Sequence, residues 1–277
     1  MNGDYTLTMR DGVGVVTCDM LSPLPVRHGF TTRLGGFSDA PIDALNLGFN
    51  RPEPRAVIES NYKKLCGAYG VDYNKLVLVS YVHGTDVLEV TKKDCGRGIK
   101  DGLTPLPDCD GIITQDPDVV LFTLHADCSA FFVVDPVHNA IGLAHAGWRG
   151  TLGRIGEKLI RKMHECYGSV PCDMYAAVGP CICGDCYEVS RDVGELFTAE
   201  FNDERLIKPH PNDEKVYLDI RTAAENAFIQ AGVPRENVGH IPCCTFENED
   251  LFYSYRRNGR GKTGAMGAFL ALGKDKS

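Results

Sequence analysis

The stretch AIGLAHAGWRG, residues 140–150, combines an apolar run, a glycine-rich loop and the start of a helix. Residues 140–144 predict a strand that is buried on both faces. The loop that follows holds His145 and Arg149 around Trp148, the only tryptophan of the chain. Because free N–H groups at a helix start suit an anion, this strand end is a place for functional groups.

Apolar runs and helical spacing along the rest of the chain predict further elements of both kinds. They interleave irregularly, with several consecutive strands in the middle, which favours mixed sheets with flanking helices over an alternating barrel. The loop-like stretch 94–111, rich in Gly, Pro and Asp, is interpreted as a surface excursion within a single domain, 1–277. Strands are expected at 14–17, 26–31, 76–79, 87–90, 119–124, 131–134 and 140–144, and helices at 54–69, 151–167 and 217–231.

Composition limits the classes of protein that the chain can belong to. Hydrophobic residues make up 43% and charged residues 24% of 277 residues, so a large core forms and wholesale disorder is excluded. A net charge of -8 argues against non-specific nucleic-acid binding. The chain shows neither a secretory signal nor an apolar stretch of roughly 18 residues, as a bilayer span needs. We therefore expect a cytoplasmic protein, bound to no membrane, whose twelve cysteines are mostly reduced.

Three segments place a metal-capable side chain just after an apolar strand: His83, Cys128 and His145. Two imidazoles and a thiolate that leave a fourth position open are typical of a catalytic zinc site. The spacings are too long for a local metal knuckle, so only the fold can bring the three together. The alternative is that they are separate core or loop residues.

Several motifs resemble, in order, those of the laccase-domain family, also called the multicopper polyphenol oxidase or purine nucleoside phosphorylase family. The strongest is His-Ala-Gly-Trp-Arg-Gly at 145–150, and together the motifs cover nearly the whole chain. The others are Phe30-Thr-Thr-Arg33-Leu-Gly-Gly36, Leu45-Asn46-Leu47-Gly48, Val82-His83-Gly84, Ala126-Asp127-Cys128, Gly179-Pro180 through Tyr187-Glu188-Val189, and Ser254-Tyr255-Arg256-Arg257.

The resemblance implies a fold, a metal and an activity. The expected fold is α+β, a single-domain α-β-β-α sandwich with mixed β-sheets and flanking helices. The expected metal ligands are His83, Cys128 and His145, with zinc as cofactor and copper as an alternative. The implied activity is phosphorolysis of purine nucleosides (adenosine, inosine and methylthioadenosine) to free base and ribose 1-phosphate, together with adenosine deamination.

The same comparison suggests roles for residues outside the metal site. Asp127 or a neighbouring acid is expected to move protons in deamination, and Arg149 and Arg33 to hold the attacking phosphate in phosphorolysis. Asn46 is expected to fix the ribose. Tyr255 and Arg256 are candidate phosphate or ribose contacts. The expected partners are a purine nucleoside and phosphate, with no nucleic acid, and the oligomeric state is left open.

The chain departs from the family pattern at three positions. Tyr81 replaces the usual Gln before the VHG motif, and His125 replaces the usual Thr before Ala-Asp-Cys. Ala265 stands where the family tends to have Arg after Thr-Gly. Loss of that Arg predicts weaker phosphate or substrate binding unless Arg260 substitutes for it.

Two other interpretations compete with this activity, and the role of one group of cysteines is open. A copper-dependent polyphenol oxidase would need several clustered histidines, and the chain has eight in all. A non-catalytic, metal-stabilised interaction protein would unfold on losing His145. Finally, a group of cysteines either packs in the core or forms a second thiolate site: Cys181, Cys183, Cys186, Cys243 and Cys244.

Overall fold

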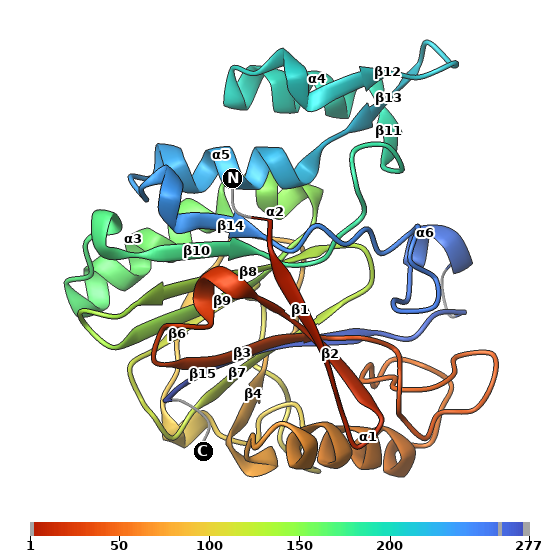
Figure 1. Cartoon of the computed structure of the whole chain (residues 1–277), viewed down its shortest axis with the longest axis vertical. Coiled ribbons are helices and arrows are strands. Elements are labelled where there is room, and N and C mark those ends of the chain that lie inside the picture. The colour runs from red at the N-terminus through yellow and green to blue at the C-terminus, as the bar shows by residue number, and fades with distance from the viewer. Residues whose placement is uncertain (1–2, 260–261, 274–277) are drawn as a thin grey trace.

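The computed structural model describes residues 3–259 and 262–273, and Arg260 lies outside them. Its centre is a pair of mixed six-stranded sheets (Figure 1). The first sheet has the order β1-β2-β3-β15-β7-β4: Tyr5–Arg10, Val13–Cys18, Val26–Thr31, Met266–Leu272, Val120–His125 and Leu76–Leu78. The second has the order β14-β10-β8-β9-β6-β5: Val238–His240, Tyr175–Val178, Ser129–Asp135, Ala140–Ala146, Gly111–Thr114 and Val87–Glu89.

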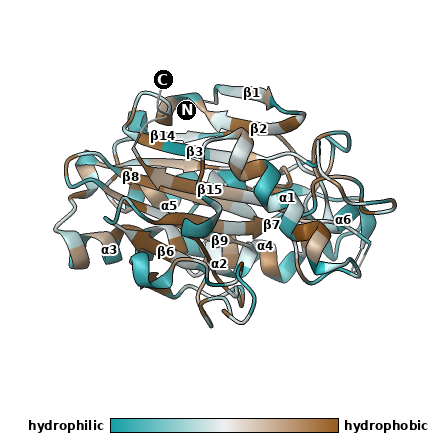
Figure 2. Ribbon diagram, turned by 90° about the horizontal axis from the view of Figure 1, so that it is seen from below, coloured by the Kyte–Doolittle hydropathy of each residue, from teal (hydrophilic) through white to brown (hydrophobic). Residues whose placement is uncertain are grey.

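Alternation along the strands builds the layers. Successive side chains of β7 point to opposite faces, so Leu121 packs between the two sheets while Val120 and Phe122 pack against α1 (Arg55–Ala68). The far face of the second sheet is covered by α3 (Ile155–Tyr167) and α5 (Ile220–Gln230). The layer order is helix, sheet, sheet, helix, which confirms the expected sandwich. Figure 2 shows hydrophobic colours gathered on the strands in the middle of the molecule.

A smaller unit lies at the end of the molecule opposite α1 (Figure 1). It consists of α4 (Arg191–Phe201) and a three-stranded sheet of β11 (Glu188–Ser190), β13 (Lys215–Leu218) and β12 (Ile207–Pro209). Phe197, Phe201 and Leu218 bury this unit against α5. It follows the loop 181–187 in the chain and fixes the far end of that loop.

The predicted strands correspond to β2, β3, β4, β5, β7, β8 and β9, each within two residues of its observed ends. Two predicted helices need correction. The helix expected at 151–167 is two helices, α2 (Trp148–Leu152) and α3, because Arg154 has a left-handed φ of 60° between them. The helix expected at 217–231 begins only at Ile220, since Tyr217 and Leu218 belong to β13.

The prediction missed β15, which pairs with both β3 and β7 at the centre of the first sheet. Its sequence, MGAFLAL, is rich in small residues with little preference for strands. Gly267 is required there, because a Cβ at this position would lie 2.2 Å from the ring of Phe122. Tertiary packing therefore determines this strand. Among the described residues, no helix is both long and apolar enough to cross a bilayer.

Candidate metal centre and its cavity

The fold brings His83, Cys128 and His145 together, with their candidate ligand atoms all within 4.8 Å of one another. His145 lies in β9 and pairs with Ala130 of β8, two residues after Cys128. Cys128 lies in the turn where the chain crosses from the first sheet to the second. His83 follows β4 on a loop and has a left-handed φ of 60°. The interpretation that these residues are unrelated is therefore wrong.

A buried carboxylate, Asp110, organises two of the three side chains. It accepts hydrogen bonds from the backbone N–H groups of Val82, His83 and Gly84, at 3.1, 3.0 and 2.8 Å. Its Oδ1 also lies 3.1 Å from Nδ1 of His145. A proton on Nδ1 leaves Nε2 of His145 as the free ligand atom. Sequence reasoning missed Asp110, because it lies in the stretch 94–111 that was interpreted as a surface excursion. The structure instead buries it fully.

Without a metal, the thiolate of Cys128 and the imidazolium of His145 stabilise each other, and a metal that binds displaces the proton from Nε2 of His145. Burial raises the pKa of Cys128, but the charge of His145 and hydrogen bonds from His145 and His83 outweigh this effect and lower it to about 7. Burial lowers the pKa of His145, while Cys128 and Asp110 raise it to about 9. The thiolate, the form of cysteine that binds metals, is thus accessible near neutral pH.

The residues present fit a zinc ion. Nitrogen and sulfur donors are those that zinc prefers, and three protein ligands with a free position are typical of its catalytic sites. A Cβ at Gly147 would lie 3.0 Å from Sγ of Cys128 and 3.1 Å from Cδ2 of His83. Gly147 therefore leaves the space that these two ligands occupy.

Two further rings complete the surroundings of the cluster at positions where the chain departs from the family pattern. Tyr81 stacks on His145 with ring centroids 4.4 Å apart and meets His83 edge-on. His125 is buried beneath the site, where Nδ1 lies 3.1 Å from the carbonyl oxygen of Cys128 and Nε2 lies 2.7 Å from Oγ1 of Thr123. Burial, followed by the nearby charge of His145, lowers the pKa of His125 well below its ordinary value. His125 thus supports the ligand turn as a neutral residue.

The cluster opens into a cavity of about 800 Å³. Arg149, Tyr255 and Arg256, all predicted to take part in the site, line it. Arg149 lies over the ring of Trp148, 4.1 Å from its centroid, and within the described part of the chain its guanidinium has no hydrogen-bond acceptor. Arg256 stacks on Tyr187 and donates to the carbonyl oxygen of Glu188 at 2.6 Å. This polar, aromatic cavity suits an anionic or aromatic ligand.

Sequence reasoning also missed Arg51, a third arginine on the cavity wall. Its Nε donates to the carbonyl oxygen of Thr263, two residues before Ala265. A guanidinium of this chain thus reaches the segment where the family usually places an arginine. No motif marked Arg51 in the sequence, because it belongs to a loop between the recognised motifs.

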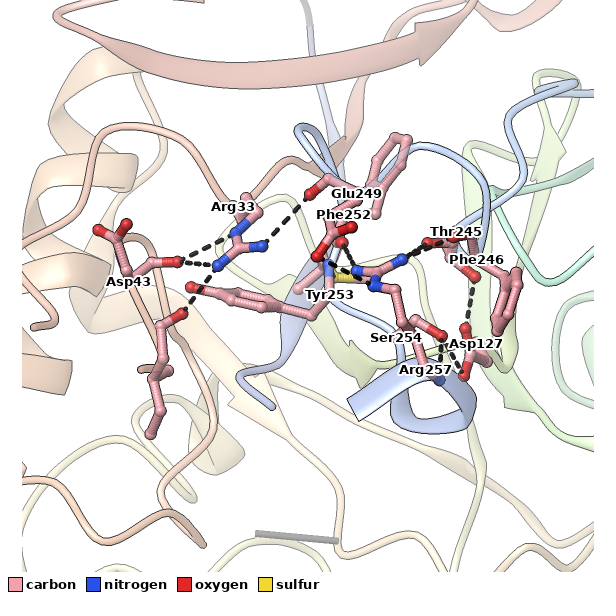
Figure 3. A network of polar contacts seen from close by, with 12 residues as sticks. Arg33, Asp43, Asp127, Thr245, Phe246, Glu249, Phe252, Tyr253, Ser254 and Arg257 are labelled. Atoms are coloured by element: carbon pink, nitrogen blue, oxygen red, sulfur yellow. Dashed lines mark hydrogen bonds and ion pairs between the residues drawn. The ribbon is translucent and has the colours of Figure 1, made fainter. Parts of the chain in front are cut away.

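The structure does not bring Arg33 into the cavity. Its guanidinium donates to the carbonyl oxygens of Ile42, Asp43 and Glu249 and stacks on Tyr253 (Figure 3). These contacts hold two loops together and leave it away from the cavity lining. Its expected role in phosphate binding is therefore not supported.

Asn46 is likewise occupied elsewhere. It is fully buried, its Oδ1 accepts from the N–H groups of Gly48 and Ala265, and its amide nitrogen donates to Glu53. It does not line the cavity. Its contacts hold the loop 46–53, which carries Arg51, so they correct the expected contact with ribose.

Asp127 lines the cavity, but both its carboxylate oxygens are engaged (Figure 3). Oδ1 accepts from the hydroxyl of Thr245 at 2.7 Å, and Oδ2 accepts from the hydroxyl of Ser254 at 3.0 Å and the N–H of Arg256 at 2.7 Å. A carboxylate with three donors acts first as an anchor. These contacts favour a positioning role over the expected proton transfer.

Replacing Asp110 by Asn is expected to weaken zinc binding about 10–100-fold, the usual effect of removing a partner that orients a ligand. An amide retains one acceptor oxygen, but its NH2 group would face N–H groups that now donate hydrogen bonds to the carboxylate. Zinc affinity measured by competition with a chelator checks this. Asp101→Asn, an exposed carboxylate of the same excursion, is the control and should bind as the unchanged protein does. Equal affinity in both variants would contradict the orienting role.

Comparison with known proteins agrees with this geometry. The profile of one protein family, described as multi-copper polyphenol oxidoreductase laccase, matches residues 27–273. The chain belongs to this family. The match includes the three residues of the candidate metal centre and all the arginines of the cavity.

Relatives of this laccase-family chain carry enzyme names. The purine nucleoside phosphorylase YlmD of Bacillus subtilis (strain 168) is 34% identical over 88% of this chain and 87% of its own. The adenosine deaminase RL5 of an unknown prokaryotic organism is 32% identical over 69% of this chain and 72% of its own. The crystal structure of YlmD from Geobacillus stearothermophilus superposes with a TM-score of 0.87 at 32% identity, covering 94% and 97% of the two chains.

Proposed function

We propose that this chain is a zinc-dependent purine nucleoside phosphorylase that also deaminates adenosine. The observation that carries the proposal is the cavity itself, in which a His-Cys-His cluster lies beside three arginines and several aromatic rings. The relatives named as phosphorylase and deaminase support the same substrate class. The proposed substrates are adenosine, inosine and methylthioadenosine with phosphate.

The arginines Arg51, Arg149 and Arg256 are the groups that bind phosphate in this proposal. Guanidinium groups bind phosphate oxygens through paired, charge-assisted hydrogen bonds. Arg149 has the most donors free, because its guanidinium stacks on the ring of Trp148 and has no hydrogen-bond acceptor among the described residues. A chain with a net charge of -8 thus gathers positive charge at one cavity.

Aromatic rings in the lining provide flat surfaces for the purine. Tyr187 and Tyr255 line the cavity with Trp148, and Tyr255 is 49% exposed. Stacking of a base on an aromatic ring contributes about 1–3 kcal/mol and tolerates different bases. This arrangement accounts for a site that accepts adenine and hypoxanthine nucleosides alike.

In phosphorolysis an oxygen of the held phosphate attacks C1′ of the ribose while the bond from C1′ to the base breaks. The departing base keeps the bonding electrons and takes a proton. His83, Cys128 and His145 would hold the zinc ion, which when bound supplies a Lewis acid at the floor of the cavity. The arginines orient the phosphate, and the aromatic rings fix the base.

Adenosine deamination replaces the 6-amino group by water and releases ammonia. It needs no phosphate, so it depends on the base-binding part of the cavity and the metal cluster and not on the arginines. The likeness to a protein named as an adenosine deaminase supports this second activity. The two activities are therefore separable by substitution.

The test is to incubate zinc-loaded protein with adenosine and with inosine, with and without phosphate, and to resolve the products by chromatography. Phosphate-dependent release of adenine and hypoxanthine is the expected result, together with phosphate-independent formation of inosine from adenosine. Copper-loaded protein with phenols and an oxygen electrode forms the parallel arm. Oxygen uptake there, with no nucleoside turnover, would instead favour the phenol oxidase.

Arg149→Met is expected to raise KM for phosphate about tenfold, equivalent to ~1.4 kcal/mol of binding free energy. It removes a charged donor with free hydrogen-bonding capacity but keeps an extended side chain over Trp148. Adenosine deamination should change little, which provides an internal control. Arg161→Met, on the exposed face of α3, should leave both activities unchanged. A tenfold loss of deamination alone would contradict the assignment of Arg149 to phosphate.

A further inference from the structure

A second cluster of metal-binding side chains lies outside the cavity. The thiols of Cys183, Cys186 and Cys244 and the carboxylate of Glu247 have ligand atoms all within 4.8 Å of one another. Sγ of Cys186 lies 3.4 Å from Oε1 of Glu247. We propose that these four side chains bind a structural zinc ion.

The sequence of the cluster has the form of a zinc-binding pair of turns. Cys183-Gly-Asp-Cys186 spaces two ligands by three residues, and Cys244-Thr-Phe-Glu247 spaces the other two in the same way. Two such short turns, far apart in the chain, are the usual arrangement of structural zinc sites. The N–H groups of Cys186 and Tyr187 donate to the carbonyl oxygen of Cys183, which forms the first turn.

The backbone aligns the two turns. Cys181 and Cys244 form an isolated parallel bridge, with the N–H of Cys181 bonded to the carbonyl of Cys243 and the N–H of Thr245 to the carbonyl of Cys181. The N–H of Cys183 lies 3.4 Å from Sγ of Cys244. The thiols thus face one another because of the backbone pairing, and the cluster is not a chance contact of mobile side chains.

The spacing of the side chains also suits zinc. A tetrahedral ion with Zn–S bonds of about 2.3 Å places its sulfur ligands about 3.8 Å apart. The observed limit of 4.8 Å closes to that value with a shift of less than the length of one bond. Metal binding releases the protons of the three thiols to solvent, and four anionic ligands then surround the ion.

Lys208 and Arg221 both interact electrostatically with Cys183 and partly offset this charge. Lys208 pairs with Asp185 at 2.5 Å, and Arg221 donates to the carbonyl of Cys243. The five cysteines considered from the sequence divide into two groups according to their surroundings. Cys181 and Cys243 pack among buried apolar residues, whereas the other three form the proposed site.

The position of the cluster gives the ion a role. The two turns carry parts of the cavity wall, because Ile182 and Tyr187 flank the first turn and both line the cavity. The second turn is held by Arg257, which donates to the carbonyls of Thr245 and Phe246 (Figure 3). A bound ion would clamp the two turns together and fix Tyr187 in place.

The experiment counts metal ions per chain by mass spectrometry, using protein purified anaerobically with reductant and equilibrated with zinc. The unchanged chain should bind about two ions, one at each cluster. Cys183→Ser/Cys186→Ser should bind about half as much zinc, and so should Cys128→Ala, which removes a ligand of the other cluster. The matched control is Cys166→Ser/Cys172→Ser, which changes two exposed cysteines and should leave the content unchanged.

Two readouts guard against misfolding of the double variant. Glu247→Gln changes an exposed ligand and should weaken binding of the second ion at least tenfold without unfolding the chain. Cobalt bound to Cys128→Ala should show strong thiolate charge-transfer absorption, since three thiolates remain at the second cluster. A single ion in the unchanged chain, or zinc content unaffected by Cys183→Ser/Cys186→Ser, would overturn the proposal. Neither readout depends on nucleoside turnover.

Discussion

Cys128→Ala is expected to lower kcat/KM for phosphorolysis of adenosine roughly a thousandfold or more, because removing one preorganised electrostatic contribution already costs ~10²–10³. The substitution leaves two imidazoles, which bind zinc far less well than a set that includes a thiolate. The fold should persist, since Cys128 lies in a turn and the sheets on either side keep their cores. Circular dichroism and steady-state kinetics with added zinc measure both effects.

Cys166→Ala is the matched control, because it removes an exposed thiol of α3 far from either cluster in the chain. It should retain full activity and zinc content. If Cys128→Ala instead unfolds the chain, the metal has a structural role and the interaction-protein interpretation gains support. If it stays folded and keeps more than a tenth of the activity, the cluster is not the catalytic centre.

Asp127→Ala is expected to lower the free energy of unfolding by about 2–4 kcal/mol and to remove most of the activity. The substitution leaves the fully buried hydroxyls of Thr245 and Ser254 without their acceptor, together with the N–H of Arg256. The start of α6 (Tyr255–Asn258) then loses its link to the turn that holds Cys128. Denaturant unfolding and kinetics on the same preparations measure the two losses.

Asp127→Asn separates anchoring from proton transfer. The amide retains one acceptor oxygen, so part of the stability and at least a few per cent of the activity should remain, with an unchanged pH profile. Asp101→Ala is the control for the loss of an exposed carboxylate. A variant that is as stable as the unchanged chain but inactive at every pH would restore the role of Asp127 in moving protons.

Periodic signals of buried strands and amphipathic helices predicted mixed sheets with flanking helices, and the resemblance to the family implied the order of the layers. The strand at 26–31 and the helix at 54–69 illustrate this, since each depends on apolar residues at its own repeat. Two of the differences from the prediction have physical reasons. β15 uses small residues to fit beneath Phe122, and the break at Arg154 depends on a left-handed backbone that no local pattern marks.

The three side chains of the candidate metal centre could be singled out because each lies in a distinct motif at the end of a strand. Arg33 and Asn46 also lie in motifs, yet the structure uses them to hold loops in place. A motif shows that a residue matters but not whether it contacts ligand or backbone. Asp110 and Arg51 were missed for the opposite reason, because they act within the site from loops without a recognisable pattern.

The most direct test of the central claim is to follow ribose 1-phosphate itself by phosphorus NMR while zinc-loaded protein acts on adenosine in phosphate buffer. A phosphorylase produces a new sugar-phosphate signal that grows in step with free purine base and is absent with Cys128→Ala. Release of base with free ribose and no new phosphorus signal would show hydrolysis. Neither base nor sugar phosphate, with the metal cluster filled, would contradict the assignment of this cavity to nucleoside phosphorolysis.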